Sequence, residues 1–220
     1  MRKVKIIFFI LLWAGVLFAQ EQKPAFWDDI QSFKKQDSIS APPENAILFI
    51  GSSSFTMWKD VQKDFPGYTI INRGFGGSTL LDQLRYVKEI VFPYKPKQVI
   101  IYCGENDIAS SDTVNGNMVA GRFYKLFNLV RNKFPKAQIT YVSMKPSPSR
   151  ELLLSKMIRG NELIRKYLSS KKKTAYIDVY KEMIDDEGKP RTDIFLEDNL
   201  HMNKDGYAIW KKLIQPHLLK

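Results

Sequence analysis

Five short apolar runs alternate along the chain with segments of helical periodicity, and this alternation constrains the fold more than any other feature. The runs are Ala46–Ile50, Tyr68–Ile71, Gln98–Tyr102, Gln138–Ser143 and Thr174–Val179. They are largely continuous in apolar character, which is typical of strands buried on both faces of a sheet. Strands that alternate with helices favour βαβ units and a parallel sheet. The pattern therefore predicts a three-layer α/β/α fold, flavodoxin-like, with a five-stranded parallel sheet between helices.

Apolar residues recur at helical spacing between and around these runs. Leu80, Leu84 and Val87, for example, fall on one stripe of the segment 79–92. The expected helices are Pro24–Gln36, Thr79–Phe92, Val114–Phe134, Glu151–Leu168 and Lys204–Leu219. No internal repeat or low-complexity segment separates them, so we expect residues 20–220 to form a single domain.

The first 19 residues have the pattern of a segment that is removed. Basic residues at positions 2, 3 and 5 precede an uncharged apolar run from Ile6 to Ala19. This run is shorter than the about 20 residues that span a bilayer, and it resembles the apolar region of a secretory signal peptide. Cleavage is expected after Ala19, although the large Leu17 leaves a retained anchor as the alternative. We therefore expect a secreted or periplasmic protein, with no stable membrane span once residues 1–19 are removed.

The charge balance is basic, with 34 Lys and Arg residues against 23 Asp and Glu. Such an excess could indicate a nucleic-acid or anionic-surface partner. The basic residues are interspersed with acidic ones along the expected helices, however, which favours solvated faces. An exported protein also seldom meets nucleic acid. No nucleic-acid partner is therefore predicted.

Cysteine and histidine are scarce, which limits the chemistry available. Cys103 is the single cysteine, so an intrachain disulfide is excluded. Its place beside the apolar run Val99–Tyr102 favours a buried strand residue over a reactive thiol. With two histidines, one cysteine and no H-E-x-x-H or paired-cysteine spacing, no metal site and no cofactor are predicted.

Polar clusters follow four of the expected strands. They are Gly51–Ser54, Asn72–Ser78, Cys103–Asp107 and, after a longer polar loop, Asp198–His201. Each alone has another explanation: a helix cap, a tight turn, local backbone contacts or, for Gly76-Gly77, a phosphate cradle, although no complete phosphate-binding pattern is present. In open parallel sheets, however, ligands bind outside the carboxyl ends of the strands. All four clusters are expected at that edge, which predicts a functional site there.

A serine and a histidine at this edge could form a nucleophile and its base. An alcohol is a weak nucleophile until an adjacent base takes its proton. Of the two histidines, His217 follows Pro216 near the C-terminus and is expected at the surface. His201 lies in a polar loop, three residues after Asp198. That spacing lets the carboxylate approach the imidazole, fix its tautomer and stabilise the imidazolium.

The order and contexts of these clusters resemble the SGNH (GDSL-type) hydrolase family over nearly the whole mature chain. The family's blocks of Gly-x-Ser, a glycine after the second strand, Gly-x-Asn-Asp and Asp-x-x-His are matched by Gly51-Ser52-Ser53, Gly77, Gly104-Glu105-Asn106-Asp107 and Asp198 with His201. The departure is Ser52, which replaces the acidic residue of the GDSL motif. This Gly-Ser-Ser variant is similar to members that resemble platelet-activating-factor acetylhydrolases. Register with the family favours Ser53 as the nucleophile, with Ser54 as the second choice.

The resemblance implies a role for each matched residue. Ser53 would attack, His201 would act as its base, and Asp198 would orient the imidazole. The Ser53 N–H, the Gly77 N–H and the Asn106 side-chain amide would donate to the oxyanion. These assignments agree with elementary chemistry, because a side chain at 77 would obstruct the acyl oxygen and a carboxylate at 106 would repel a developing anion.

The resemblance also implies the reaction. We expect a serine esterase that acts through an acyl-enzyme on Ser53, with a small-molecule or glycan ester as its partner. The short loops at the strand ends and the lack of a long apolar insertion favour short-chain, acetyl-type esters, and the polar character of the loops favours carbohydrate as the alcohol. Lysophospholipid or another acyl lipid is the alternative substrate. A non-catalytic exported binding protein of the same fold is the alternative of another class, and the complete residue set argues against it.

Two further groups allow both a structural and a functional interpretation. Lys145, Ser147 and Arg150 follow the fourth strand at the same edge of the sheet, where they could line the pocket or begin a helix. Tyr207 and Trp210 lie three residues apart on the last helix and are expected in the core rather than on a substrate platform.

Overall fold

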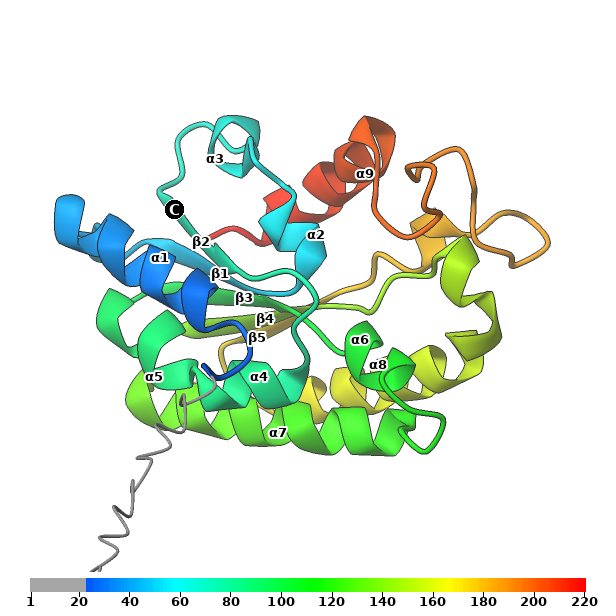
Figure 1. Cartoon of the computed structure of the whole chain (residues 1–220), viewed down its shortest axis with the longest axis horizontal. Helices are drawn as coiled ribbons and strands as arrows, with labels where there is room; N and C mark the ends of the chain where they lie inside the picture. The colour runs from blue at the N-terminus through cyan, green and yellow to red at the C-terminus, as the bar shows by residue number, and fades with distance from the viewer. Residues whose placement is uncertain (1–22) are drawn as a thin grey trace, which may run out of the picture.

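The computed structural model describes residues 23–220, so the predicted signal segment lies outside the described residues. Five parallel strands form one sheet in the order β2-β1-β3-β4-β5 (Figure 1). The strands are β1 Ile47–Gly51, β2 Ile70–Gly74, β3 Gln98–Tyr102, β4 Gln138–Val142 and β5 Thr174–Ile177. The predicted α/β/α fold with a five-stranded parallel sheet is confirmed, and the strand bounds differ from expectation by no more than three residues.

The helices lie on both faces of the sheet (Figure 1). The α-helices are α1 Trp27–Ile39, α2 Ser53–Thr56, α3 Val61–Asp64, α4 Leu80–Arg85, α5 Val87–Ile90, α6 Glu105–Ala109, α7 Gly116–Lys133, α8 Leu154–Ser169 and α9 Lys204–Ile214. Short 3₁₀ turns are η1 Phe92–Tyr94, η2 Pro148–Leu153, η3 Lys181–Met183 and η4 Gln215–His217. Within residues 23–220, no helix is both long enough and apolar enough to cross a membrane.

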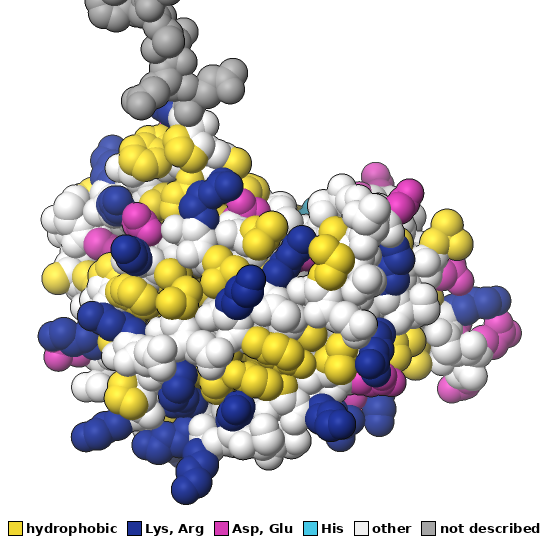
Figure 2. Space-filling view, turned by 90° about the horizontal axis from the view of Figure 1, so that it is seen from below, with side chains coloured by type: hydrophobic (Ala, Val, Ile, Leu, Met, Phe, Trp, Pro, Cys, Tyr) yellow, Lys and Arg dark blue, Asp and Glu magenta, His cyan; other side chains and the backbone are white. Residues whose placement is uncertain are grey.

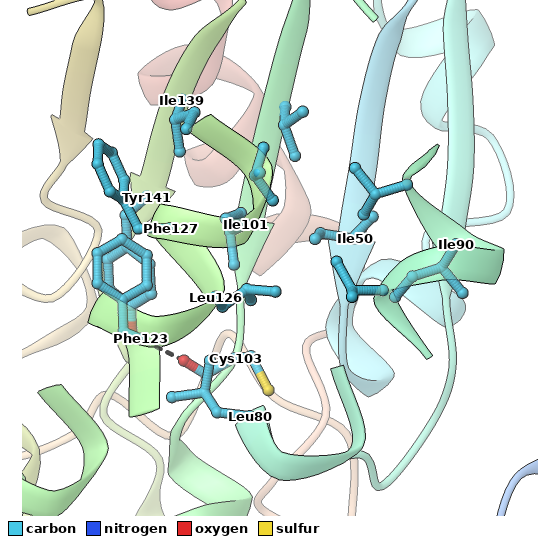
Figure 3. Close-up of a cluster of buried hydrophobic side chains, with 14 of the residues drawn as sticks. Ile50, Leu80, Ile90, Ile101, Cys103, Phe123, Leu126, Phe127, Ile139 and Tyr141 are labelled. Atoms are coloured by element: carbon cyan, nitrogen blue, oxygen red, sulfur yellow. Dashed lines mark hydrogen bonds between the residues drawn. The ribbon is translucent and has the colours of Figure 1, made fainter. Parts of the chain in front are cut away.

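Alternate residues of each strand enter two separate hydrophobic cores. On one face, Leu48, Ile50 and Ile101 pack with residues of α1, α4, α5, α7 and α8. Figure 3 shows part of this core, including Phe123 of α7 beside Tyr141 of β4. On the other face, Phe49 packs with residues of α2, α3 and α9, and the fully buried Trp210 belongs to this second core. The strands are therefore covered on both sides, and Trp210 is a core residue as expected.

The segment predicted as one helix over 79–92 is divided, and that prediction is wrong in this respect. Tyr86 leaves helical geometry at φ −103° and ψ 12°, between α4 and α5. Its hydroxyl donates to the Ala25 carbonyl at 2.6 Å, and its ring packs edge-on against Phe75. These tertiary contacts of a buried tyrosine outweigh the periodicity of the segment.

The ends of the last two long helices also differ from expectation. The segment that begins at Pro148 is a 3₁₀ turn with a non-helical Arg150, so the regular helix α8 starts only at Leu154. At the C-terminus, α9 ends at Ile214 and a 3₁₀ turn containing Pro216 follows. Proline lacks the N–H that another helical turn would need, which accounts for the earlier end.

Basic side chains are dispersed over the face beneath the sheet, where α7 lies. Figure 2 shows Lys and Arg side chains on this face separated by hydrophobic and uncharged polar groups. Lys125 and Lys133 of α7 are among the exposed residues. On this face the charges do not gather into the continuous stripe that would track a nucleic-acid backbone.

Candidate active site

The turn after β1 exposes one of its three serines. Gly51 ends the strand at φ 142°, and a Cβ there would lie 1.8 Å from the Tyr102 carbonyl oxygen, so only glycine fits. Ser52 and Ser54 are each 2% exposed, whereas Ser53, the first residue of α2, is half-buried. Ser53 is therefore the serine of this turn that can meet a substrate.

The turn after β2 lies directly against Ser53. A Cβ on Gly76 would stand 3.9 Å from the Ser53 Cβ, and Gly77 has a left-handed backbone at φ 80°. Gln83 in α4 donates to the Ser78 hydroxyl at 2.9 Å and to the Gly51 carbonyl at 3.3 Å. This buried glutamine ties the first two turns together and holds Gly77 beside α2.

The third turn places Asn106 between the first two. Its Nδ2 donates to the Ser52 Oγ at 2.7 Å and to the Ser78 carbonyl at 3.1 Å. The neighbouring Asp107 is fully buried and accepts from the Leu80 N–H at 2.8 Å and from Arg122 at 2.7 Å. The Asp of Gly-x-Asn-Asp therefore fixes the start of α4, and the Asn faces the serine turn.

His201 and Asp198 form a hydrogen-bonded pair in the long loop between β5 and α9. Asp198 Oδ2 lies 2.6 Å from His201 Nδ1, and its Oδ1 accepts from the backbone N–H groups of Leu200 and His201, each at 2.9 Å. The N–H and ring of His201, followed by the N–H of Leu200, lower the pKa of Asp198 to about 2. The carboxylate thus makes both the local backbone contacts and the imidazole contact that the sequence left as separate possibilities.

The second histidine, His217, lies near the amino ends of the strands. The His217 carbonyl accepts from Gln98 Nε2 at 2.8 Å, and Gln98 is the first residue of β3. The candidate residues all follow the carboxyl ends of the strands. His217 is therefore remote from them, and it is half-buried rather than exposed as predicted.

Most of the site residues predicted from the sequence line a single cavity. It has a volume of about 370 Å³ and is lined by Ser53, Thr56, Met57, Gly76, Gly77, Asn106, Arg150, Leu200 and His201. Asp198 joins it through the His201 ring. Within the described residues no hydrogen bond joins the Ser53 hydroxyl to His201, and such bonds are often long before substrate binds. Among residues 23–220, no three His, Cys, Asp or Glu side chains are grouped as metal ligands would be.

A buried group of charges behind Asn106 was not predicted. Glu105 and Lys145 are 3% and 1% exposed, and Lys145 Nζ lies 3.1 Å from Glu105 Oε1. Tyr102 donates to Glu105 Oε2 at 2.6 Å, and Arg150 Nη1 lies 3.7 Å from Glu105 Oε1. Burial acts to raise the pKa of Glu105, but the charges of Lys145 and Arg150 outweigh it and lower the pKa. Removing one member of such a buried group typically costs about 3–5 kcal/mol of stability.

The structure distinguishes between the two interpretations of the segment after β4, which were lining of the pocket and the start of a helix. Arg150 lines the cavity, whereas Lys145 and Ser147 are buried and do not line it. Ser147 precedes the 3₁₀ turn η2 but makes no side-chain cap there. Arg73, from the cluster after β2, points away from the cavity toward α1, where it contacts Asp37 and donates to the Tyr94 hydroxyl at 2.7 Å.

Cys103 is expected to resist alkylation in the folded protein. The side chain is fully buried, and burial, with a smaller contribution from the Asp107 charge, raises the pKa of its thiol well above the ordinary value. The reactive thiolate is therefore scarce at neutral pH. Iodoacetamide at pH 8 should leave the native protein unmodified by mass spectrometry and modify it once in urea. Rapid labelling of the native protein with loss of activity would contradict this.

The sequence pattern of a known protein family matches most of the chain. The pattern of the GDSL-like Lipase/Acylhydrolase family matches residues 37–209, which include every candidate site residue. None of the curated proteins matches the chain.

Solved structures share the fold. A provisionally assigned acylhydrolase from Bacteroides fragilis has 22% identity and a TM-score of 0.76, covering 87% of this chain and 96% of that chain. A GDSL-like lipase from Bacteroides thetaiotaomicron has 23% identity and a TM-score of 0.72, covering 86% and 96%. A mutant of an acetyl-xylooligosaccharide esterase from Geobacillus has 15% identity and a TM-score of 0.63, covering 80% and 94%.

At identities this low the structural likeness establishes a common fold, and the sequence pattern establishes the family. The pattern spans well over half of the chain and contains the serine turn, the Gly-x-Asn-Asp turn and the Asp-x-x-His loop. The predicted resemblance to SGNH hydrolases is confirmed. The chain belongs to the GDSL-like lipase/acylhydrolase family and is a serine hydrolase that acts on ester bonds.

Proposed function

We propose that this enzyme hydrolyses short-chain, acetyl-type esters of carbohydrates through an acyl-enzyme on Ser53. The observation that carries the proposal is the convergence of Ser53, Gly77, Asn106 and His201 on one cavity, with Asp198 bonded to the far side of the imidazole. These residues come from four separate turns. Each has a role that ester hydrolysis requires.

The reaction begins with attack of the Ser53 Oγ on the acyl carbon while His201 Nε2 takes the hydroxyl proton. Asp198 keeps Nδ1 protonated and stabilises the imidazolium. The tetrahedral intermediate collapses when His201 gives its proton to the leaving alcohol oxygen. Water then attacks the acyl-enzyme with His201 again as base, which releases the carboxylic acid and regenerates Ser53.

The oxyanion of both tetrahedral intermediates needs donors already in place. We assign the Ser53 N–H, the Gly77 N–H and the Asn106 Nδ2. In the free enzyme the Asn106 Nδ2 donates to the Ser52 hydroxyl and to the Ser78 carbonyl. The acyl oxygen must therefore share or replace one of these two bonds when it enters.

The cavity favours a small acyl group. Its volume of about 370 Å³ lies at the low end of the range for ligand pockets, and the backbone of Gly76 and Gly77 forms one wall. Met57 and Leu200 supply apolar surface that can contact a short acyl group. The acetyl-xylooligosaccharide esterase among the structural neighbours gives independent support for an acetylated carbohydrate. The signal-like pattern of residues 6–19 supports a place of action outside the cytoplasm.

A series of nitrophenyl esters tests the acyl length. We expect kcat/KM to be highest for two- and three-carbon acyl groups and to fall by at least about tenfold at eight carbons, because a chain too long for this small cavity displaces the ester or strains the cavity walls, typically at about 1–3 kcal/mol. Acetylated xylo-oligosaccharides then test the alcohol. A kcat/KM that rises steadily to eight carbons or beyond would contradict the proposal and favour an acyl-lipid substrate.

A further inference from the structure

Arg150 contacts the Asn106 side chain from the side opposite to the serine turn. Its Nη2 donates to Asn106 Oδ1 at 2.7 Å. Its Nη1 lies 3.7 Å from Glu105 Oε1, and the side chain is 15% exposed. Arg150 therefore connects the buried charges of Glu105 and Lys145 to the amide that faces the cavity.

This contact fixes which end of the amide faces the cavity. An amide turned by 180° would exchange Nδ2 and Oδ1 and would place its NH₂ group against the guanidinium, donor against donor. On the other side, the Ser78 carbonyl can only accept, which selects the same orientation. The Asn106 Nδ2 is thus directed toward Ser52 and the cavity from both sides.

The contact also changes the strength of the amide as a donor. A cation bound to the amide oxygen draws electron density from the nitrogen, which makes the N–H groups better donors. Lys145 and Arg150 carry two positive charges against the single negative charge of Glu105, so the group as a whole is positive. Such a charge favours a negative oxygen nearby, most strongly where water is excluded.

We propose that Arg150 is a positioning residue for ester hydrolysis, which holds and polarises the Asn106 amide so that it stabilises the oxyanion. The inference rests on the proposed role of Asn106 as an oxyanion donor. Arg150 acts in the transition state through Asn106. Its loss therefore lowers kcat and leaves KM nearly unchanged.

A double-mutant cycle on Arg150→Met and Asn106→Ala tests this, with an acetyl ester as substrate. We expect Asn106→Ala to lower kcat by about 10²–10³-fold, the usual loss for one oxyanion donor. Arg150→Met should lower kcat by about 10- to 100-fold, as for loss of a charge-assisted hydrogen bond, with KM changed by less than about threefold. In the Asn106→Ala background, Arg150→Met should cost less than about threefold, because the amide through which it acts is gone.

A matched control removes another partly buried guanidinium. Arg131 donates to the carbonyls of Pro135 and Ala137, before β4 and away from the cavity. Arg131→Met should lower the thermal unfolding temperature and leave kcat unchanged. If Arg150→Met does not fold, Arg150→Lys replaces it, because lysine keeps the charge near Glu105 and loses the planar fork that reaches Asn106. We expect the same selective loss of kcat.

The outcomes separate this inference from the proposed function. An equal loss for Arg150→Met in both backgrounds, or a loss confined to KM, overturns the positioning role and points to direct contact with substrate. A large loss for Asn106→Ala with full activity for Arg150→Met overturns the positioning role alone. A silent Asn106→Ala overturns the oxyanion role of Asn106 itself.

Discussion

Ser53→Ala is expected to lower kcat for acetyl esters by at least about 10⁴-fold while the protein remains folded, since removal of a nucleophilic serine is among the largest single losses in serine hydrolases. The side chain is half-buried and lines the cavity, and within residues 23–220 its hydroxyl makes no hydrogen bond that the fold would lose. Activity should therefore fall without a matching fall in the unfolding temperature. Single-turnover and steady-state rates with nitrophenyl acetate measure the loss.

Ser54→Ala is the matched control for Ser53→Ala. Ser54 is 2% exposed, and its hydroxyl is buried without a hydrogen-bond partner in the described part of the chain. Its replacement should leave kcat within about threefold of the wild type, as expected for a residue outside the reaction. A fluorophosphonate probe should label the wild-type protein at Ser53 and leave Ser53→Ala unlabelled. Labelling at Ser54, or full activity of Ser53→Ala, would place the nucleophile elsewhere.

The strands, and the polar loops that follow them, could be predicted because strong local patterns encode them. Residues such as Leu48 and Phe49 are both buried, on opposite faces, so the run is apolar throughout and has no competing interpretation. Three of the polar clusters follow directly from the ends of these strands, and the fourth, Asp198–His201, comes after a longer loop. The sequence thus predicted which loops would meet at the cavity, and the structure brings Ser53, Gly77, Asn106 and His201 together there.

The short helices and the break at Tyr86 could not be predicted from periodicity. Helices α2 and α6 have four and five residues, too few for an apolar stripe to repeat. The stripe of 79–92 is regular in sequence, and its interruption depends on the contact between Tyr86 and Ala25, which lie 61 residues apart. Local propensity is a weak guide wherever a distant contact decides the backbone.

The buried charges of Glu105, Lys145 and Arg150 behind Asn106 could not be predicted from the sequence for a related reason. Glu105 occupies the variable position of Gly-x-Asn-Asp, and its partner Lys145 is 40 residues away. A single Glu or Lys after a strand is typical of a solvated loop, so neither residue alone indicates burial. The missing information was that β3 and β4 are neighbours in the sheet, so that residues just past their ends become buried against each other. Opposite charges that directly follow adjacent strands are the signal that would have revealed this group.

His201→Ala is expected to lower kcat by about as much as Ser53→Ala, because the hydroxyl and its base act as a unit. For the same reason, the double variant should be no worse than either single one. Asp198→Ala should cost less, about 10⁴-fold against the about 10⁶-fold that is typical for loss of the nucleophile or the base. Its carboxylate is 47% exposed, so solvent weakens its effect on the ring. The pKa of Asp198 is about 2, below the ordinary 3.8, so the ionised form that orients His201 is complete above pH 4 and is lost only as pH falls toward 2.

The other histidine supplies the control for this last prediction. The backbone carbonyl of His217 accepts a hydrogen bond from Gln98 near the amino ends of the strands, and alanine keeps that carbonyl. His217→Ala should therefore retain full kcat and kcat/KM for the acetyl ester, while His201→Ala loses both. Steady-state kinetics at pH 8 compare the two variants under conditions where Asp198 is ionised in both. If His201→Ala retained activity within about tenfold, the loss would be smaller than that of one oxyanion donor. The base would then have to be a group other than this imidazole.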